Sequence, residues 1–247
     1  MIKFFRHIRK SLLMENKTGT YLKYAIGEIV LVVIGILIAI QLNEWRHDNS
    51  NNNQKQIVLK ALQLEFKANL EQMDSVLFYT EKILKIYPIV NEMIKSPEGN
   101  YSEENMSNAI LNLAWTWTFN PSNGALRSAI SSSQIHLLDN KRLIELLFSW
   151  EDVVKDSEEE ALTMRKYQYD SRYMLTNYIR MSDSWRSHFP GMVAANSPSD
   201  YRGLLQDVAF EDYSTLSYAY AIEYIRELNI IKNQNKEILT LIKAEIK

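Results

Sequence analysis

The chain has 247 residues and no cysteine, which excludes disulfide bonds, thiolate metal sites and cysteine nucleophiles. Stability must therefore come from burial, and the roughly 200 residues after the first 48 are enough for one sizeable core. Charge separates the two parts: residues 1–23 hold six basic residues and one acidic residue, whereas residues 49–247 carry 21 basic and 26 acidic residues, a net charge of −5.

The first 23 residues are expected to form a cytoplasmic, basic amphipathic segment. On a helix its apolar side chains gather on one side, and most of its basic residues lie elsewhere, which suits a segment lying along an anionic leaflet. The residues expected to contact anionic lipid are Lys3, Arg6, Arg9 and Lys10. A few cations without a recognised nucleic-acid-binding module give little support to a nucleic-acid partner, so none is expected.

Residues 24–42 form an apolar stretch long enough to cross a bilayer. Its 19 residues are close to the roughly 20 that span the hydrocarbon core as an α-helix. The main alternative is a cleaved signal peptide, but the leader is long and no A-x-A cleavage pattern follows. We therefore predict a single transmembrane helix. Because lysine and arginine are more frequent before it than after it, the N-terminus should stay in the cytoplasm and the rest should be exported.

Glu28 is the one charged residue of this span, and two roles are open for it. It lies about 6 Å deeper along the helix than Tyr24, so its carboxylate can reach back toward the headgroups and Lys23. It could instead pair with a basic group on another membrane protein or on a second copy of this chain. A proton relay is less favoured, because one acid makes a poor conduit.

Other residues of the span suggest interface anchoring and self-association. Aromatic side chains suited to the two membrane interfaces are those of Tyr21, Tyr24 and Trp45. Small residues recur on one face at multiples of four, and these are Gly27, Gly35 and Ala39. Small residues allow two membrane helices to approach closely, so a homo-oligomer is predicted; glycines merely tolerated in lipid are the alternative.

Beyond the span the sequence predicts an exported helical domain over residues 56–247. Residues 43–55 are polar and asparagine-rich, which indicates a short spacer or a frayed helix start. Apolar residues then recur at helical spacing from Leu59 to Ile94 and predict a long helix, with Pro88 as the place for a bend. Ser102, followed by two glutamates, has the features of the next N-cap.

The remainder indicates an all-α fold. A shorter helix is predicted over 104–119, and Asp139 is expected to cap a second long helix that runs to Trp185. A last helix from about Tyr213 to Ile246 carries a core-facing stripe that includes Ile222. The predicted architecture is one N-terminal transmembrane helix followed by a bundle of three long helices plus one or two short ones.

Two stretches resemble a known family. The opening "FFRHIRKSLLMENKTGTYLKYAIGEIVLVVIGILIAIQLNEW", residues 4–45, is similar to the N-terminal signature of an uncharacterised family of single-span membrane proteins of Bacteroidota, a domain-of-unknown-function family. The later stretch "FNPSNGALRSAISSSQIHLLDNKRLIELLFSWEDV" resembles that family's middle segment, with Ser133 where glycine is expected. The resemblance implies an envelope protein of a Gram-negative bacterium with an exported helical domain. It supplies no activity, substrate or catalytic residue.

The residues themselves predict no catalytic, cofactor or metal site. The four histidines include no i, i+4 pair of the zinc type. Glu44 and His47 have the spacing of a di-iron ligand pair, but no second such pair exists. The thioethers of one stripe could hold Cu(I), although core filling is favoured because no histidine shares the stripe. These residues are Met164, Met174 and Met181.

The function expected from the sequence is that of a non-catalytic interaction or scaffold protein. It would be a single-pass protein of the bacterial inner membrane, with a cytoplasmic N-terminus and a periplasmic C-terminal domain. Its partners would be membrane lipid, a second copy of the chain and an envelope protein of unknown identity. The alternative is a sensory or small-ligand-binding helical domain anchored in the inner membrane. That alternative is weaker because receptors of this kind use a second span, and residues 210–247 are too polar to supply one.

Overall fold

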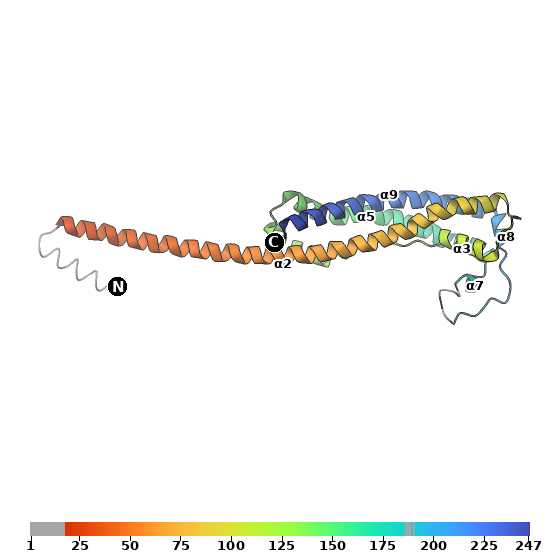
Figure 1. Ribbon diagram of the computed structural model, residues 1–247, viewed down its shortest axis with the longest axis horizontal. Coiled ribbons are helices and arrows are strands. Elements are labelled where there is room, and N and C mark those ends of the chain that lie inside the picture. The colour runs from red at the N-terminus through yellow and green to blue at the C-terminus, as the bar shows by residue number, and fades with distance from the viewer. Residues whose placement is uncertain (1–17, 186–188, 190) are drawn as a thin grey trace. The chain divides into compact units, whose positions relative to one another are not determined.

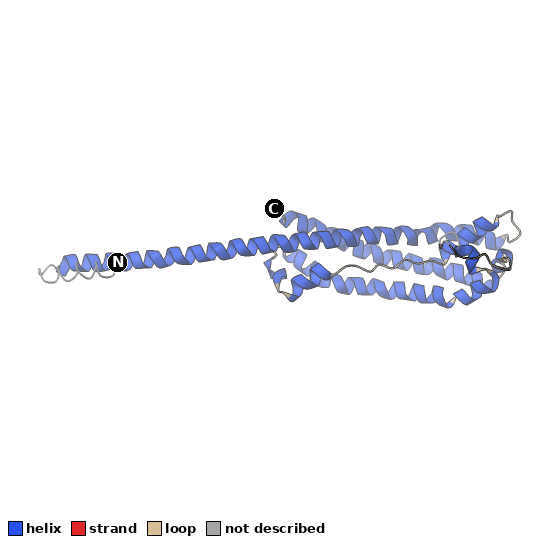
Figure 2. Cartoon of the chain, turned by 90° about the horizontal axis from the view of Figure 1, so that it is seen from below, coloured by secondary structure: helices blue, strands red, loops and turns tan. Residues whose placement is uncertain are grey.

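The structure is a computed structural model that describes residues 18–185, 189 and 191–247. All regular secondary structure of these residues is helical, which confirms the predicted all-α class (Figure 2). The chain divides into two units, Met1–Gln56 and Ile57–Lys247. The division falls inside the longest helix, α2 (Thr18–Lys95).

Residues 43–55, expected to be a spacer or a frayed helix start, are helical and belong to α2. The helix continues because no helix-breaking residue interrupts it, since the sequence has neither glycine nor proline between Gly35 and Pro88. Asparagine is a poorer helix former than alanine by roughly 0.7 kcal/mol per residue, which weakens a helix without ending it. Pro88 lies inside α2, where it removes one backbone hydrogen bond.

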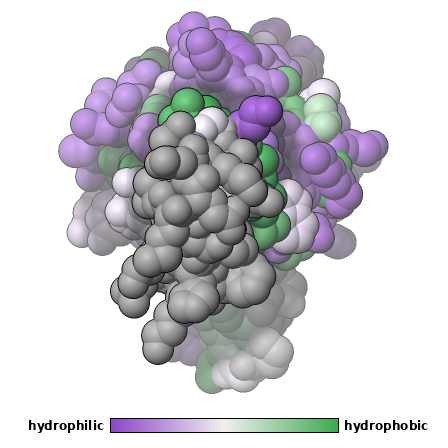
Figure 3. All heavy atoms as spheres, turned by 90° about the vertical axis from the view of Figure 1, so that its left-hand side faces the viewer, coloured by the Kyte–Doolittle hydropathy of each residue, from purple (hydrophilic) through white to green (hydrophobic). Residues whose placement is uncertain are grey.

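Three long helical stretches build the second unit. Residues 57–95 of α2 lie beside α5 (Lys141–Asp170) and α9 (Val208–Glu245), as Figures 1 and 2 both show. Phe66 on α2 meets the buried Trp150 on α5 edge to face, with ring centroids 4.8 Å apart. Each such buried aromatic or aliphatic side chain contributes about 1.5–3 kcal/mol of transfer free energy. Hydrophilic residues make up most of the coloured surface visible in Figure 3.

Short helices are more numerous than the one or two expected. The described residues contain α3 (Glu103–Leu113), α4 (Gly124–Ser131), the 3₁₀ helix η1 (Gln134–Leu137), α6 (Arg172–Tyr178), α7 (Met181–Trp185) and α8 (Tyr201–Leu205). Ser102 caps α3 as predicted, because its Oγ accepts a hydrogen bond of 3.1 Å from the backbone N–H of Asn105.

The second long helix differs from its prediction at both ends. Its N-cap is Asn140 and not Asp139, because the Asn140 Oδ1 accepts a hydrogen bond from the N–H of Leu143 at 3.1 Å. It ends at Asp170 and not at Trp185, with a turn at Ser171. The sequence around this turn, YQYDSRY, consists largely of residues with low helix propensity, and these favour a break.

The last helix also begins earlier than predicted, and of its predicted core stripe Leu228, Ile231, Ile238 and Ile242 are fully buried whereas Ile222 is not. Asp207 caps α9 by accepting a hydrogen bond from the N–H of Ala209 at 2.9 Å. Ile222, predicted to be buried, is 41% exposed, whereas its neighbours Ala221 and Tyr224 are fully buried. Because successive helical residues are about 100° apart, a stripe that contains Ala221 leaves Ile222 facing away from it.

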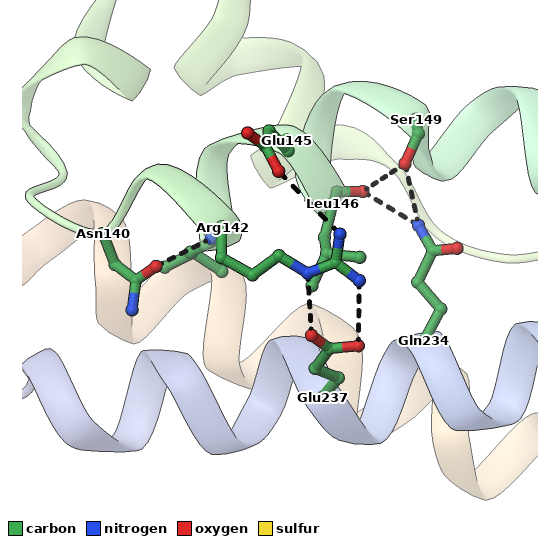
Figure 4. A network of polar contacts seen from close by, with 8 residues as sticks. Asn140, Arg142, Glu145, Leu146, Ser149, Gln234 and Glu237 are labelled. Atoms are coloured by element: carbon green, nitrogen blue, oxygen red, sulfur yellow. Dashed lines mark hydrogen bonds and ion pairs between the residues drawn. The ribbon is translucent and has the colours of Figure 1, made fainter.

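A polar network at one edge fixes how α5 and α9 align (Figure 4). Arg142 on α5 donates two hydrogen bonds to Glu237 on α9, from Nε at 2.9 Å and from an Nη at 3.3 Å. The amide of Gln234 on α9 donates to the carbonyl oxygen of Leu146 at 3.0 Å. The Arg142 guanidinium lowers the pKa of Glu237 by hydrogen bonding to it. The pair is exposed, so it selects the register of the two helices more than it stabilises them.

Ser133 occupies a backbone conformation that favours glycine. Its φ of 59° lies in the left-handed region, and it is the only non-glycine residue with positive φ among the residues that the structure describes. It connects α4 to η1, and its N–H donates to the carbonyl oxygen of Ile130 at 3.0 Å. The glycine expected here from the family resemblance is therefore the residue that this turn requires.

Replacing Ser133 with glycine should stabilise the protein. The exposed serine side chain caps no helix, and glycine adopts positive φ without the steric cost that a Cβ imposes. We expect Ser133→Gly to raise the free energy of unfolding by about 0.5–1 kcal/mol in urea denaturation. The control is Ser132→Gly, which should lower it, because Ser132 has a φ of −87° and its Oγ donates to the carbonyl oxygen of Ser128 at 2.7 Å. A loss of stability in Ser133→Gly would contradict this account of the turn.

Candidate functional site

The first candidate site is the apolar section of α2. Among the described residues, this is the one helix long and apolar enough to cross a membrane, and none of its most apolar window is buried. Large apolar side chains point outward all around it, among them Ile26, Ile29, Leu31, Val33, Ile36 and Leu37. A core helix of a water-soluble domain would be mostly buried. The section therefore fits a membrane span or a signal sequence.

The structure places some of the predicted residues of this section. A Cβ built on Gly27 or Gly35 would meet nothing within 4 Å, and Ala39 is exposed, so these small residues border open space. Glu28 has intermediate exposure. Trp45 is 66% exposed.

The remaining membrane-related predictions concern residues whose side chains are not described. Tyr21 and Tyr24 belong to α2 by their backbone. The four predicted lipid contacts, Lys3, Arg6, Arg9 and Lys10, lie outside the described residues.

The second candidate site depends on the connection between α3 and α4. A helix was predicted to reach residue 119, but α3 ends at Leu113 and residues 115–123 contain no helix. The sequence Trp-Thr-Trp-Thr-Phe alternates aromatic and β-branched residues, which lose side-chain freedom in a helix and suit an extended chain. Pro121 then prevents a helix from restarting at once. This alternation is the sequence signal for the extended segment, whereas the predicted helix over 104–119 wrongly includes these residues.

One buried polar side chain from each long helical stretch holds this connection. Gln168 on α5 donates to the carbonyl oxygen of Leu113 at 3.1 Å and accepts from the Thr116 hydroxyl at 2.5 Å. The Tyr224 hydroxyl on α9 accepts from the N–H of Phe119 at 3.0 Å. The bonds to Leu113 and Phe119 supply partners for backbone groups that no helix pairs, and the bond to Thr116 holds its side chain.

The third side chain is that of Asn69 on α2, and it forms hydrogen bonds with the backbone at the end of the segment. Its amide donates to the carbonyl oxygen of Ser122 and accepts from the Ser122 N–H, both at 2.8 Å. Just beyond, Glu65 accepts from the N–H groups of Ala125 and Leu126 at the start of α4, at 2.7 and 3.0 Å. The carboxylate thereby takes the place of an N-cap side chain, which Asn123 does not provide.

The held segment presents Trp115 and Trp117 to a hollow of about 370 Å³, which we call the aromatic hollow. Tyr79 of α2 stacks on Trp117 with centroids 4.7 Å apart. Trp185 of α7 meets Trp115 edge to face at 5.0 Å and stacks on Phe189 at 5.5 Å. Five aromatic rings from three parts of the second unit therefore line one hollow. This volume lies at the lower end of the range typical of small-molecule sites.

Few polar groups accompany these rings. The Nζ of Lys82 lies 4.8 Å from the Tyr79 ring centroid and 4.9 Å from that of Phe78. Asn108 and Asn112 of α3 also line the hollow, and the Asn112 amide donates to the backbone carbonyl oxygen of Asn108 at 2.7 Å. No carboxylate stands among the described lining residues, so Lys82 gives the hollow a positive charge.

A second, more polar hollow of about 780 Å³ shares Trp115 and Trp117 with the first. Its cationic residues are Arg165, Lys166 and Arg172. Lys166 is paired with Asp170 at 2.6 Å, and the Arg172 guanidinium lies 5.0 Å from the ring centroid of Tyr169. Of these three cations, Lys166 is thus already paired with a carboxylate.

Metal and redox features are sparse in the part of the chain that the structure describes. No group of three or more histidine, aspartate or glutamate side chains there could hold a metal ion. Met164 is fully buried, and Met174 and Met181 pack against the hydrophobic core. This location agrees with the interpretation of the methionine stripe as core filling.

The tyrosine that holds Phe119 makes the fold sensitive to alkaline pH. Burial raises the pKa of Tyr224 to about 12, with an opposing contribution from the hydrogen bond that its hydroxyl accepts. An unfolded tyrosine has a pKa near 10, so the folded protein keeps this proton to a higher pH than the unfolded chain does. The resulting stability is present below about pH 10 and is lost as pH rises toward 12.

Urea denaturation between pH 8 and pH 11 tests whether Tyr224 causes a loss of stability at alkaline pH. Tyr224→Phe should flatten the alkaline loss of stability while lowering stability at neutral pH by about 1–3 kcal/mol, because the Phe119 N–H loses its partner. Burial raises the pKa of Tyr213 as well, so part of the slope should remain. Tyr173→Phe, at a 77% exposed residue, is the control. Equal slopes in the parent protein and Tyr224→Phe would refute the assignment.

Comparison with known proteins assigns a family. The sequence model of a family of unknown function (DUF6090) matches residues 28–163, more than half of the 247 residues. The matched region contains Asn69, Trp115 and Trp117 and ends before Gln168 and Tyr224. No curated protein and no solved structure matches the chain. The chain therefore belongs to the DUF6090 family of unknown function.

Proposed function

We propose that this protein is a non-catalytic, membrane-anchored interaction or scaffold protein of the bacterial cell envelope. The observation that carries the proposal is the apolar section of α2, whose outward-facing side chains are covered by no other part of the described chain. About 20 such residues in water would expose a large apolar surface, whereas a bilayer covers them without cost to the backbone, because helical hydrogen bonds are internal.

Topology follows from charge in this proposal. Six basic residues precede the span, and only Arg46, Lys55 and Lys60 lie in the twenty residues after it, which favours a cytoplasmic N-terminus and a periplasmic second unit. The resemblance of residues 4–45 to a Bacteroidota family supports the inner membrane of a Gram-negative cell. Retention of the span as an anchor, as opposed to cleavage of a signal sequence, is supported by the lack of a small-x-small site after it.

A second candidate function is that of an anchored ligand-binding domain. The specific observation in its favour is the aromatic hollow in the second unit, which has the concavity and the few polar groups of a small-molecule site. Both candidate functions use the same anchor and differ in what the exported domain recognises.

Cysteine labelling tests the topology. Because the chain has no native cysteine, an introduced cysteine is the only thiol that can react. Ser50→Cys, at an exposed residue after the span, should react with a membrane-impermeant maleimide in spheroplasts. Ser11→Cys should react only after the membrane is permeabilised. The labelled full-length chain should also stay in the membrane pellet after alkaline carbonate extraction. The reverse labelling pattern, or a shortened chain released from the membrane, would overturn the anchor.

Self-association through the span has its own test. Gly35→Ile places a bulky side chain where nothing lies within 4 Å in the single chain, so the monomer should be unaffected. If the face with Gly27, Gly35 and Ala39 forms a close helix pair, this variant should reduce the signal of a membrane two-hybrid assay severalfold. Ile34→Gly changes a neighbouring residue on another face and serves as the control. An unchanged signal in Gly35→Ile would exclude this face as the dimer contact.

A further inference from the structure

We propose that the aromatic hollow is a binding site for a small aromatic carboxylate, whose ring lies against the tryptophan and tyrosine rings and whose carboxylate pairs with Lys82. This inference rests on the second candidate function and does not depend on the orientation of the span or on self-association. Its site lies entirely within the second unit.

The rings of the hollow are arranged to receive another flat ring. Trp115 and Trp117 are 44% and 45% exposed, far more than ordinary core tryptophans such as Trp150, so ring surface remains uncovered. Aromatic rings gain about 0.5–1.5 kcal/mol from stacked or edge-to-face contact beyond the free energy of burial. Exposed tryptophans lower solubility. Single exposed apolar residues are ordinary on a protein surface, but several that cluster around one hollow indicate a binding site.

The backbone beneath these rings is held in place before any ligand arrives. Gln168 bonds on both sides of Trp115, to Leu113 and Thr116, and Tyr224 bonds to Phe119. A ligand therefore does not have to order this segment, and less of the binding free energy is lost to conformational entropy.

Charge selects an acid. Among the described residues, Lys82 is the one ionisable amine of the hollow, its ammonium lies over two rings, and the lining includes no carboxylate. An ammonium in partly desolvated, apolar surroundings gains most from an anionic partner with which it can form a charge-assisted hydrogen bond. The amides of Asn108 and Asn112 stand nearby as further hydrogen-bonding groups.

The polar groups are too few for a sugar acid. A pyranose carries several hydroxyl groups, each of which needs a partner when it leaves water. Beside the Tyr79 hydroxyl and the indole N–H groups of its three tryptophans, the hollow offers two amides and one ammonium, which suit one carboxylate and few further polar groups. An aromatic ring with a carboxylate meets this balance, because its ring requires no hydrogen bonds.

The test uses the full-length chain in phosphatidylcholine nanodiscs, with empty nanodiscs as the blank. Saturation-transfer NMR titrations would compare three acids, 4-hydroxybenzoate, indole-3-acetate and phenylacetate, with 4-hydroxybenzamide and with glucuronate. We expect at least one aromatic acid to bind, and 4-hydroxybenzamide and glucuronate to bind roughly tenfold more weakly or not at all. Three of the five tryptophans line the hollow, so the same acid should change the intrinsic fluorescence.

Variants then assign the binding to the hollow. Lys82→Met keeps the aliphatic stem and removes the charge, so the acid should bind about tenfold more weakly while the preference over its amide disappears. Lys85→Met, one turn away on the exposed side of α2, should bind as the parent does. Trp117→Leu should weaken the acid and the amide alike, because it removes ring contact and not charge.

Several results would overturn the inference. These are no binding of the three aromatic acids at millimolar concentration, glucuronate binding as tightly as they do, or a Lys82→Met variant that keeps the full preference for the acid. If Lys82→Met fails to fold, the comparison of acid with amide on the parent chain still decides the role of charge. Correct labelling of Ser50→Cys with no ligand binding would reject the hollow and leave the anchor intact.

Discussion

The structure of the second unit depends on how a segment without regular secondary structure is accommodated between α3 and α4. Its backbone groups cannot be left unpaired against a hydrophobic core, since each would cost about 1–3 kcal/mol. Asn69, Gln168 and Tyr224 supply the missing partners, one from each long helical stretch, and all three are buried. The same bonds that connect the three helical stretches also hold the irregular segment in which Trp115 and Trp117 lie at the surface. Packing and the candidate ligand site thus share one set of interactions.

The other constraint acts along α2, whose sequence changes character within one helix. Up to residue 42 its apolar residues face all directions, which suits a solvent without hydrogen-bonding groups. From Ile57 onward only one stripe is buried, which suits a helix with water on its other side. Helical hydrogen bonds satisfy the backbone in both settings, so one helix can serve both. What differs is the environment that the side chains require.

Helical periodicity was enough to predict the all-α class and the three long helical stretches, because burial of a stripe leaves a regular trace in the sequence. It was not enough to place boundaries that depend on single hydrogen bonds. Asn140 caps α5 in place of Asp139 because of where its side chain reaches, and both residue types are equally good caps. Tyr224 was missed as a core residue because its burial depends on a partner, the Phe119 N–H, that lies 105 residues away. Ser133 was the reverse case, since the glycine expected there matched the conformation that the structure shows.

The aromatic hollow could not be predicted for the same reason. Its rings come from residues 79, 115, 117, 185 and 189, and only the folded chain brings them together. The most direct test of the account is amide hydrogen exchange at Phe119 and Ser122 in the full-length chain, measured residue by residue. Both lie outside helices, yet buried side chains accept from both N–H groups. The account predicts that these two amides are protected to the same degree as core amides of α5. Exchange at the rate of an unstructured peptide would show that the segment is not held, and would remove the basis for the site.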